Sequence, residues 1–374
     1  MPLGQARASG DLERVSAKAI LQCQSPGGAF VASPDFPQYR YCWLRDGSFA
    51  AYALDRAGEH QSSSAYHGWV DCVIGRMANL IDRAVEKRRA NKVIDPGDLP
   101  PARFALDGSL LDDDWPNFQI DGYGTWLWSL REHLQLSGLT DLPSSRRDAV
   151  ERAARFLATF AFDPCFDVWE MSGTAVHTST LASVYAGLTA ASAMLGDRGL
   201  AARAEEVRAS VLASAGSAVR FKKSSVSGET DASTLWLASP FRLVESRDPV
   251  FLATVSAIER DLSFEGGLRR FPGDTYFGGG AWPVLTASLG WHYASVGDRP
   301  RALACQSWIE ARFSADGELG EQFGGELRDR PMYDQWANHW GPPARQLVWS
   351  HAMYLVLRAE LGSSPKPAAT AGTE

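Results

Sequence analysis

The feature that most constrains the fold is a helical spacing of apolar residues that recurs along most of the chain. Apolar side chains repeat every three or four positions in several long stretches, which is the period of an amphipathic α-helix. Repeated β-type alternation is not found. We therefore expect an all-α protein. The clearest stripes are Val150, Ala153, Ala154, Leu157 and Phe160; Leu181, Val184, Tyr185, Leu188 and Ala191; Leu285, Leu289, His292 and Val296; and Val348, Ala352, Leu355 and Ala359.

Weaker patterns raise the number of expected helices to about twelve. Twelve helices arranged as six hairpins close naturally into a double ring, in which the inner helices share an axis and loops at one end form a pocket. We predict a single domain of this kind over residues 1–361. The segment 362–374 is rich in Ser, Pro, Ala and Thr and is expected to be disordered. The additional helices are expected over 11–24, 48–56, 62–87, 120–137, 199–213, 230–238, 247–260 and 299–312.

Composition excludes several classes of protein. With 45% hydrophobic and 22% charged residues the chain has ample material for a core, and its net charge of -7 argues against a nucleic-acid partner. The sequence contains no run of about 18 apolar residues and no signal-peptide pattern at its start, so we expect no membrane span and a cytoplasmic location. The five cysteines include no C-x-x-C pair, so neither disulfides nor a zinc site is expected.

An acidic residue among large apolar groups lies near the middle of the chain. Glu170 stands in the stretch Phe166-Asp167-Val168-Trp169-Glu170-Met171, which Ser172 and Gly173 then follow. A carboxyl group beside an indole loses water around its charged form, so its pKa should rise and it should act as a general acid. The alternative is a structural role, as a helix cap or the partner of an Arg.

An Arg–Asp pair follows two aromatic residues near the N-terminus. Arg45 and Asp46 offer donors and acceptors that suit sugar hydroxyls, and Tyr41 and Trp43 beside them would exclude water. Asp46 could also be the N-cap of the helix expected to start near Ser48. The alternative is an N-capping Asp next to a solvated Arg.

An acidic cluster, Asp112 to Asp114, precedes Trp115 in a loop rich in Pro, Gly and Asp. The three carboxylates could hold a hard cation, but we interpret them as a solvated acidic loop. The sequence has no phosphate-cradling Gly loop followed by Lys and no His pair at metal spacing. No metal and no cofactor are expected.

Six motifs, in order, resemble those of glycoside hydrolase family 15, the glucoamylase and glucodextranase family, over residues 12–361. The resemblance implies an (α/α)6 barrel that removes glucose from the non-reducing end of an α-glucoside and inverts the anomeric centre. The matching stretches are Tyr41 to Asp46, Trp115 to Gly122, Val168 to Met171, His177 to Ser179, Arg270 to Tyr276, and Leu319 to Phe323 with Leu347 to His351 after it.

The resemblance also implies roles for individual residues. Glu170 would be the general acid and Glu321 the general base. Arg45, Asp46, Arg270 and Trp169 would contact the terminal glucose, Trp115 and Trp282 would be platforms near the scissile bond, and Tyr41 would support the acid. Arg270 could instead form a structural ion pair with Asp274, Trp282 could be core packing, and His177 is interpreted as a structural residue.

The neighbours of the second carboxyl group agree with its implied role. Glu321 lies between Gly320 and Gln322, small and polar residues that should leave it ionised and able to polarise water. An inverting pair must also stand about 6.5–9.5 Å apart, so that water fits between the base and the sugar.

Two departures from the family pattern bear on the substrate. No β-sandwich or starch-binding module is expected, and Gly273 stands where an acidic residue often follows the Arg-Phe-Pro motif. The chain is most similar to minimal single-domain bacterial members, among which isomaltose glucohydrolases are known. We therefore favour isomaltose or short isomalto-oligosaccharides as substrate, with α-1,4 and α-1,1 linkages left open.

Two other classes of function share some features of this sequence. Helical double barrels also host terpene cyclases, which use acidic motifs such as Asp112 to Asp114, but the Arg, Asp and amide residues here suit hydroxyls rather than a carbocation. A catalytically silent sugar-binding protein would explain the 13 Trp residues. The presence of both glutamates argues against that alternative.

Overall fold

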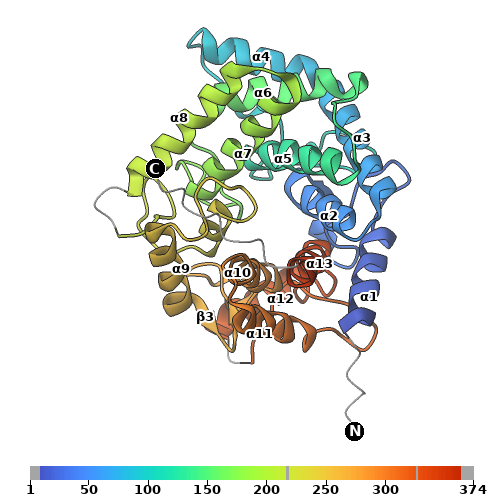
Figure 1. Cartoon of the computed structure of the whole chain (residues 1–374), viewed down its shortest axis with the longest axis vertical. Helices are drawn as coiled ribbons and strands as arrows, with labels where there is room; N and C mark the ends of the chain where they lie inside the picture. Colours follow the sequence, from blue (N-terminus) through green and yellow to red (C-terminus); the bar gives the residue numbers. More distant parts are fainter. Residues whose placement is uncertain (1–8, 216–218, 326, 364–374) are drawn as a thin grey trace, which may run out of the picture.

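The computed structural model describes residues 9–215, 219–325 and 327–363. Six inner elements form a closed ring within these residues, because each contacts the next and the last contacts the first. Figure 1 shows the ring, with the chain running around it once from blue to red. The inner elements are α2 (Leu44–Arg56), α5 (Asp121–Leu136), α7 (Thr178–Leu195), the 3₁₀ helix η4 (Ala232–Leu237), α10 (Pro283–Ser295) and α13 (Val348–Gly362).

An outer layer of helices covers this ring. Each outer helix precedes its inner partner in sequence, as expected for helical hairpins packed side by side. The expected all-α double ring is therefore confirmed. The outer helices are α1 (Ser9–Gln22), α3 (His60–Arg76), α6 (Arg147–Phe160), α8 (Arg198–Ala215), α9 (Pro249–Leu262) and α11 (Arg299–Glu310).

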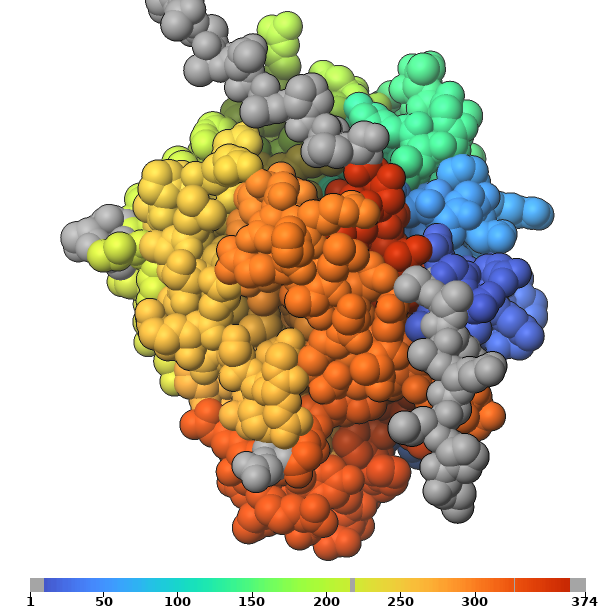
Figure 2. Space-filling view, turned by 60° about the horizontal axis from the view of Figure 1, so that its bottom comes forward, coloured from blue at the N-terminus to red at the C-terminus, as the bar shows by residue number. Residues whose placement is uncertain are grey.

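The remaining described elements are short or lie in connections. The strands form two antiparallel pairs, β1 (Cys42–Trp43) with β2 (Arg103–Phe104) and β3 (Ser263–Phe264) with β4 (Gly267–Leu268). Helix α12 lies at the surface at the lower end of Figure 2, in orange-red. The other helices are α4 (Ala78–Arg89), α12 (Arg330–Trp340) and the 3₁₀ turns η1 (Pro37–Tyr39), η2 (Pro96–Asp98), η3 (Ser144–Arg146) and η5 (Tyr276–Gly278).

The apolar stripes read from the sequence face the core. All five stripe residues of α6 are buried, and α7 is buried on nearly every side because it belongs to the inner ring. Helices α5 and α7 pack closely where Gly124 meets Gly187. A Cβ at Gly187 would lie 2.6 Å from the Cα of Gly124, so a side chain there would force these two helices apart.

Several expected boundaries were wrong. The helix expected over 62–87 is two helices, because the backbone leaves helical geometry at Met77. The helix expected over 230–238 is the short η4, since Pro240 prevents an α-helix from continuing past it. Helix α2 begins at Leu44, so Asp46 lies in its first turn and is not its N-cap. Helix α12 was not expected: its apolar side is short, with Tyr333, Trp336 and Ala337 packed against Phe36 and Phe277, and none of its residues is fully buried.

Aromatic side chains fill the barrel beneath its loop-bearing end. Trp349 stacks on Phe49 with ring centres 5.5 Å apart and contacts Trp236 at 5.6 Å, and Phe49 contacts Trp128 at 5.7 Å. A cavity at the loop end of the barrel therefore has a closed floor.

Helix α13 ends at Gly362, and residues 364–374 of the tail expected to be disordered lie outside the described residues. Within the described ranges, no helix combines the length and the apolarity needed to cross a bilayer.

Candidate active site

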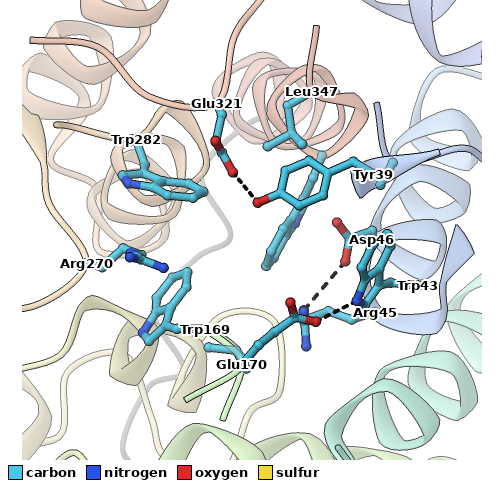
Figure 3. Close-up of a pocket in the computed structure, with 13 residues that line it drawn as sticks. Tyr39, Trp43, Arg45, Asp46, Trp169, Glu170, Arg270, Trp282, Glu321 and Leu347 are labelled. Carbon is cyan, nitrogen blue, oxygen red and sulfur yellow. Dashed lines mark hydrogen bonds and ion pairs between the residues drawn. The ribbon is translucent and has the colours of Figure 1, made fainter. Parts of the chain in front are cut away.

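A pocket of about 490 Å³, including the open space at its mouth, lies at the loop end of the barrel. Its walls come from the starts of the inner helices α2, α10 and α13 and from the loops before α2, α7, α10, α12 and α13. Figure 3 shows Glu170 and Glu321 on opposite sides of this pocket. The lining residues are Ala32, Tyr39, Trp43, Arg45, Asp46, Val168, Trp169, Glu170, Arg270, Trp282, Glu321, Leu347 and Trp349.

Glu170 is held by hydrogen-bond donors. Its Oε1 accepts from Trp43 Nε1 at 2.7 Å, Trp115 Nε1 at 3.0 Å and Gln119 Nε2 at 3.0 Å. The side chain is only partly buried, so the expected dry apolar surroundings are not found. The hydrogen bonds that the described residues make to this carboxyl group all go to Oε1, which leaves Oε2 for the pocket.

The backbone around Glu170 is a tight turn built on Asp167. Glu170 has a φ of 64°, in the left-handed region, and its N–H donates to the carbonyl of Asp167 at 2.8 Å. The carboxylate of Asp167 accepts from the backbone N–H groups of Trp169 and Met171. Left-handed backbone at a non-glycine residue is uncommon and is held only where its surroundings require it.

Trp169 does not shield Glu170 in the way the sequence suggested. Its Nε1 donates to both carboxylate oxygens of Asp231, at 3.1 and 3.0 Å, and Lys223 Nζ lies 3.2 Å from the same carboxylate. The indole therefore forms a wall of the pocket, tied to the residue that caps η4.

Glu321 has the drier environment of the two carboxyl groups. Its side chain is 1% exposed, Oε1 accepts from the Tyr39 hydroxyl at 2.9 Å, and Oε2 is buried without a hydrogen-bond partner. Burial raises the pKa of Glu321 to about 8, against the lowering effects of Tyr39 and Arg270. The expectation that small polar neighbours keep this carboxyl group ionised was wrong, because the fold buries the group regardless of the residues next to it in sequence.

Arg45 and Asp46 both line the pocket. Arg45 Nη1 donates to Asp121 Oδ2 at 2.9 Å and to Gln119 Oε1 at 3.1 Å. Its Nε, 3.6 Å from Asp46 Oδ2, makes no hydrogen bond, and neither does that oxygen. Burial raises the pKa of Asp46 to about 6. This donor and this acceptor form an ion pair but make no hydrogen bond, so they suit the hydroxyl groups of a ligand.

Arg270 and Trp282 both show the structural role considered as an alternative, and both also line the pocket. Arg270 forms a two-point ion pair with Asp274, at 2.8 and 2.6 Å, and also lines the pocket. Its guanidinium lies 5.4 Å from the Trp169 ring centre and 5.1 Å from that of Trp282. Trp282 packs in the core as the N-cap residue of α10, while its buried Nε1 has no partner.

The described residues include one cluster with metal-binding side chains, away from the pocket. Asp55, His67 and His133 each place one ligand atom within 4.8 Å of the others. Asp55 already accepts from His133, His60 and Ser63, at 2.6–3.0 Å, and these bonds join α2, α3 and α5.

Comparison with known protein families identifies this architecture. The model of glycosyl hydrolases family 15 matches residues 12–328. The chain belongs to glycosyl hydrolase family 15. It is therefore a glycoside hydrolase, and the terpene-cyclase alternative is wrong.

Two curated relatives differ in how far they resemble this family 15 member. An isomaltose glucohydrolase from Kribbella flavida is 38% identical over 96% of this chain and 94% of its own length. An uncharacterised glycosyl hydrolase from Methanocaldococcus jannaschii is 28% identical over 90% of this chain, but only 53% of that protein is covered.

Solved structures extend the comparison. A variant glycosidase in complex with glucose is 36% identical and superimposes with a TM-score of 0.90 over 95% of this chain and 97% of that one. A glucoamylase from Saccharomycopsis fibuligera, 16% identical, gives a TM-score of 0.72 over 94% of each chain and shares the fold.

The remaining residues singled out in this family 15 sequence lie around the pocket. Trp115 contacts Glu170 but is not a lining residue, and Tyr41 packs against Trp43 with ring centres 6.5 Å apart. His177 Nε2 lies 3.0 Å from the carbonyl of Cys165 and 3.1 Å from that of Ser172, which fits the structural role expected for it.

The sequence interpretation gave no role to several residues of the site. Tyr39, Leu347 and Trp349 line the pocket, Gln119 donates to Glu170, and Asp231 anchors Trp169. Trp43, expected only to exclude water, also donates to Glu170. The family motifs contain four of these residues, so a position within a motif was a signal for a role in the site. They are Trp43, Gln119, Leu347 and Trp349. Tyr39 and Asp231 lie outside the motifs and become visible only in the fold.

Proposed function

We propose that this glycoside hydrolase inverts the anomeric centre and releases β-glucose from the non-reducing end of short α-gluco-oligosaccharides. The observation that carries the proposal is the placement of Glu170 and Glu321 on opposite sides of one pocket. Inverting hydrolysis needs an acid on the leaving-group side of the sugar and a base on the other side, with water between the base and the sugar.

Glu170 is proposed as the general acid. Its Oε2 would give a proton to the glycosidic oxygen as the bond from that oxygen to the anomeric carbon breaks. The three donors on Oε1 fix the carboxyl group and leave the second oxygen toward the pocket. One oxygen is held by the protein and the other is left for the substrate, which supports the assignment of Glu170 as the acid.

Glu321 is proposed as the general base. A water molecule would attack the anomeric carbon from the opposite side and pass a proton to Glu321, so each proton gained by a leaving group is balanced by one lost from water. Because burial raises the pKa of Glu321 to about 8, the active form of the free enzyme should gain population as pH rises through that value.

Exo action is supported by the shape of the pocket. Trp349 and the aromatic stack behind it close the floor, so a chain end fits and a chain interior does not. Arg45, Asp46 and Arg270 would bind the hydroxyls of the terminal glucose, with Trp169 and Trp282 as apolar walls. Trp115 would be a platform near the scissile bond, and Tyr41 would support the general acid.

Isomaltose is the favoured substrate, because the isomaltose glucohydrolase of Kribbella flavida resembles this chain over nearly its full length. Short isomalto-oligosaccharides are included in this proposal. Glucoamylase-type hydrolysis of α-1,4 linkages is the second candidate, since a glucoamylase shares the fold. We also propose one catalytic domain over residues 1–361 and a cytoplasmic location.

The test is a panel of isomaltose, maltose, kojibiose, nigerose and trehalose, with the first product observed by proton NMR. We expect the highest kcat/KM on isomaltose and β-glucose as the initial product. Early α-glucose would exclude inversion. A higher kcat/KM on maltose would show that α-1,4 linkages are preferred, and the proposed inverting hydrolysis would still hold.

A further inference from the structure

Arg103 lies under the aromatic residues that surround the Glu170 carboxyl group. It belongs to β2, directly opposite Trp43 of β1, and its side chain is buried. The guanidinium carbon is 3.9 Å from the ring centre of Trp115, 4.5 Å from that of Tyr41 and 5.3 Å from that of Trp43. One cation therefore contacts three rings, an arrangement that holds those rings relative to one another.

Asp113 completes the arrangement around Arg103. Its Oδ2 accepts from Arg103 Nη2 at 2.7 Å, and its Oδ1 accepts from the backbone N–H of Trp115 at 3.1 Å. The same carboxylate thus fixes the guanidinium and the backbone of the residue on which the guanidinium lies. Asp113 belongs to the acidic cluster that the sequence analysis interpreted as a solvated loop. In the structure it instead binds Arg103 and the backbone of Trp115.

The consequence reaches the catalytic carboxyl group. Two of the three rings around Arg103, the indoles of Trp43 and Trp115, donate to Glu170 Oε1 at 2.7 and 3.0 Å. If either indole tilts, Oε1 loses a donor and the carboxyl group can rotate about its last bond. The free oxygen would then no longer be fixed toward the glycosidic oxygen.

We propose that Arg103, fixed by Asp113, is a positioning residue that locks the two indoles and thereby aims Glu170 Oε2 at the leaving group. The inference rests on the proposed acid role of Glu170. Arginine suits this position because its guanidinium is flat and can lie against several ring faces at once. Its Nε and Nη1 are buried without hydrogen-bond partners, so the ring faces are their main contacts.

The test compares two substrates that differ in their need for an acid. Isomaltose has a poor leaving group that must be protonated, whereas fluoride leaves α-glucosyl fluoride with little proton transfer from a carboxyl group. We expect Arg103→Met to lower kcat on isomaltose by about 10- to 100-fold, the cost of misplacing a reacting group. On α-glucosyl fluoride it should change kcat less than about threefold. Arg103→Lys should behave like Arg103→Met, since the ammonium group cannot lie flat on three rings.

A matched control is available on the outer layer of the barrel. Arg203 of α8 also combines an aromatic contact, 4.8 Å from the Phe162 ring centre, with an ion pair, to Glu206. Arg203→Met should leave kcat unchanged on both isomaltose and α-glucosyl fluoride. Circular dichroism and thermal unfolding of each variant would confirm that the variants remain folded.

Three outcomes separate this inference from the proposed function. Equal losses on both substrates by Arg103→Met, with Glu170→Gln impaired on isomaltose alone, would overturn the positioning role and keep the acid. Equal losses on both substrates by Glu170→Gln would overturn the acid role itself. A loss on isomaltose alone by both variants supports the proposal.

Discussion

The two sides of the pocket hold their carboxyl groups by opposite means. Glu170 is partly exposed and is fixed by three N–H donors on one oxygen. Glu321 is buried, receives one hydroxyl donor and keeps one oxygen without a partner. The first arrangement determines direction, whereas the second determines protonation, because burial disfavours the charged form. Two glutamates thus differ in orientation and in protonation because different residues surround them in the folded chain.

The largest effect should follow loss of the carboxylate on the buried side. Glu321→Gln cannot accept a proton from water, so we expect kcat to fall by about 10²- to 10⁴-fold on isomaltose and on α-glucosyl fluoride alike. Steady-state kinetics on both substrates would measure this. Near-normal hydrolysis of the fluoride would show that the buried carboxyl group is not the base.

The ion pair beside Glu321 should matter chiefly for stability. Asp274→Asn leaves the buried Arg270 guanidinium without its anionic partner, which costs about 3–5 kcal/mol in comparable sites. Equilibrium unfolding in urea would measure the loss. Asp334→Asn, which breaks an exposed pair with Arg330, is the control and should barely change the unfolding midpoint. Similar midpoints for both variants would mean that the buried pair contributes no more than a surface pair.

Tyr39 offers a way to shift protonation on the buried side. Its hydroxyl donates to Glu321 and lowers the pKa of that carboxyl group, which burial has raised to about 8. In Tyr39→Phe the pKa should therefore rise further, so the acid limb of kcat/KM should move to higher pH. At pH 7 activity should fall by about tenfold or more, the value of one hydrogen bond to a charged group. An unchanged or downward-shifted limb would contradict the assignment of Glu321 as the group that must ionise.

The smallest effect is expected on the other side. Trp115→Phe removes one of three donors to Glu170 Oε1 and keeps an aromatic ring on Arg103, so kcat on isomaltose should fall by about fivefold, near 1 kcal/mol. The acid limb governed by Glu321 should stay in place. A shift of that limb in Trp115→Phe would mean that the two sides of the pocket are not independent.

Much of the architecture was predictable because helical periodicity is a local property. The stripes of α6, α7, α10 and α13 are confirmed, and the motifs placed Glu170 and Glu321 in one pocket as the family resemblance implied. The site residues keep their proposed roles until tested.

The electrostatics of the pocket were not predictable from neighbours in sequence. Tyr39 and Glu321 are 282 positions apart and Trp43 and Glu170 are 127 apart, so the contacts that distinguish the two carboxyl groups exist only after the ring closes. Trp169, adjacent to Glu170, turns instead toward Asp231. The boundaries of η4 and the presence of α12 were missed because both helices are short, so a helical repeat of apolar residues has little length in which to show.

The contact between α2 and α13 joins nearly the first and the last helices of the described chain. Arg45 and Asp46 stand on α2, while Leu347 and Trp349 lie at the start of α13, and together they enclose the sugar-sized hollow. The chain must be synthesised as far as the start of α13 before this hollow can exist. Partly synthesised or C-terminally clipped chains would accordingly have a gap in the wall and no enclosed place for a glucose unit.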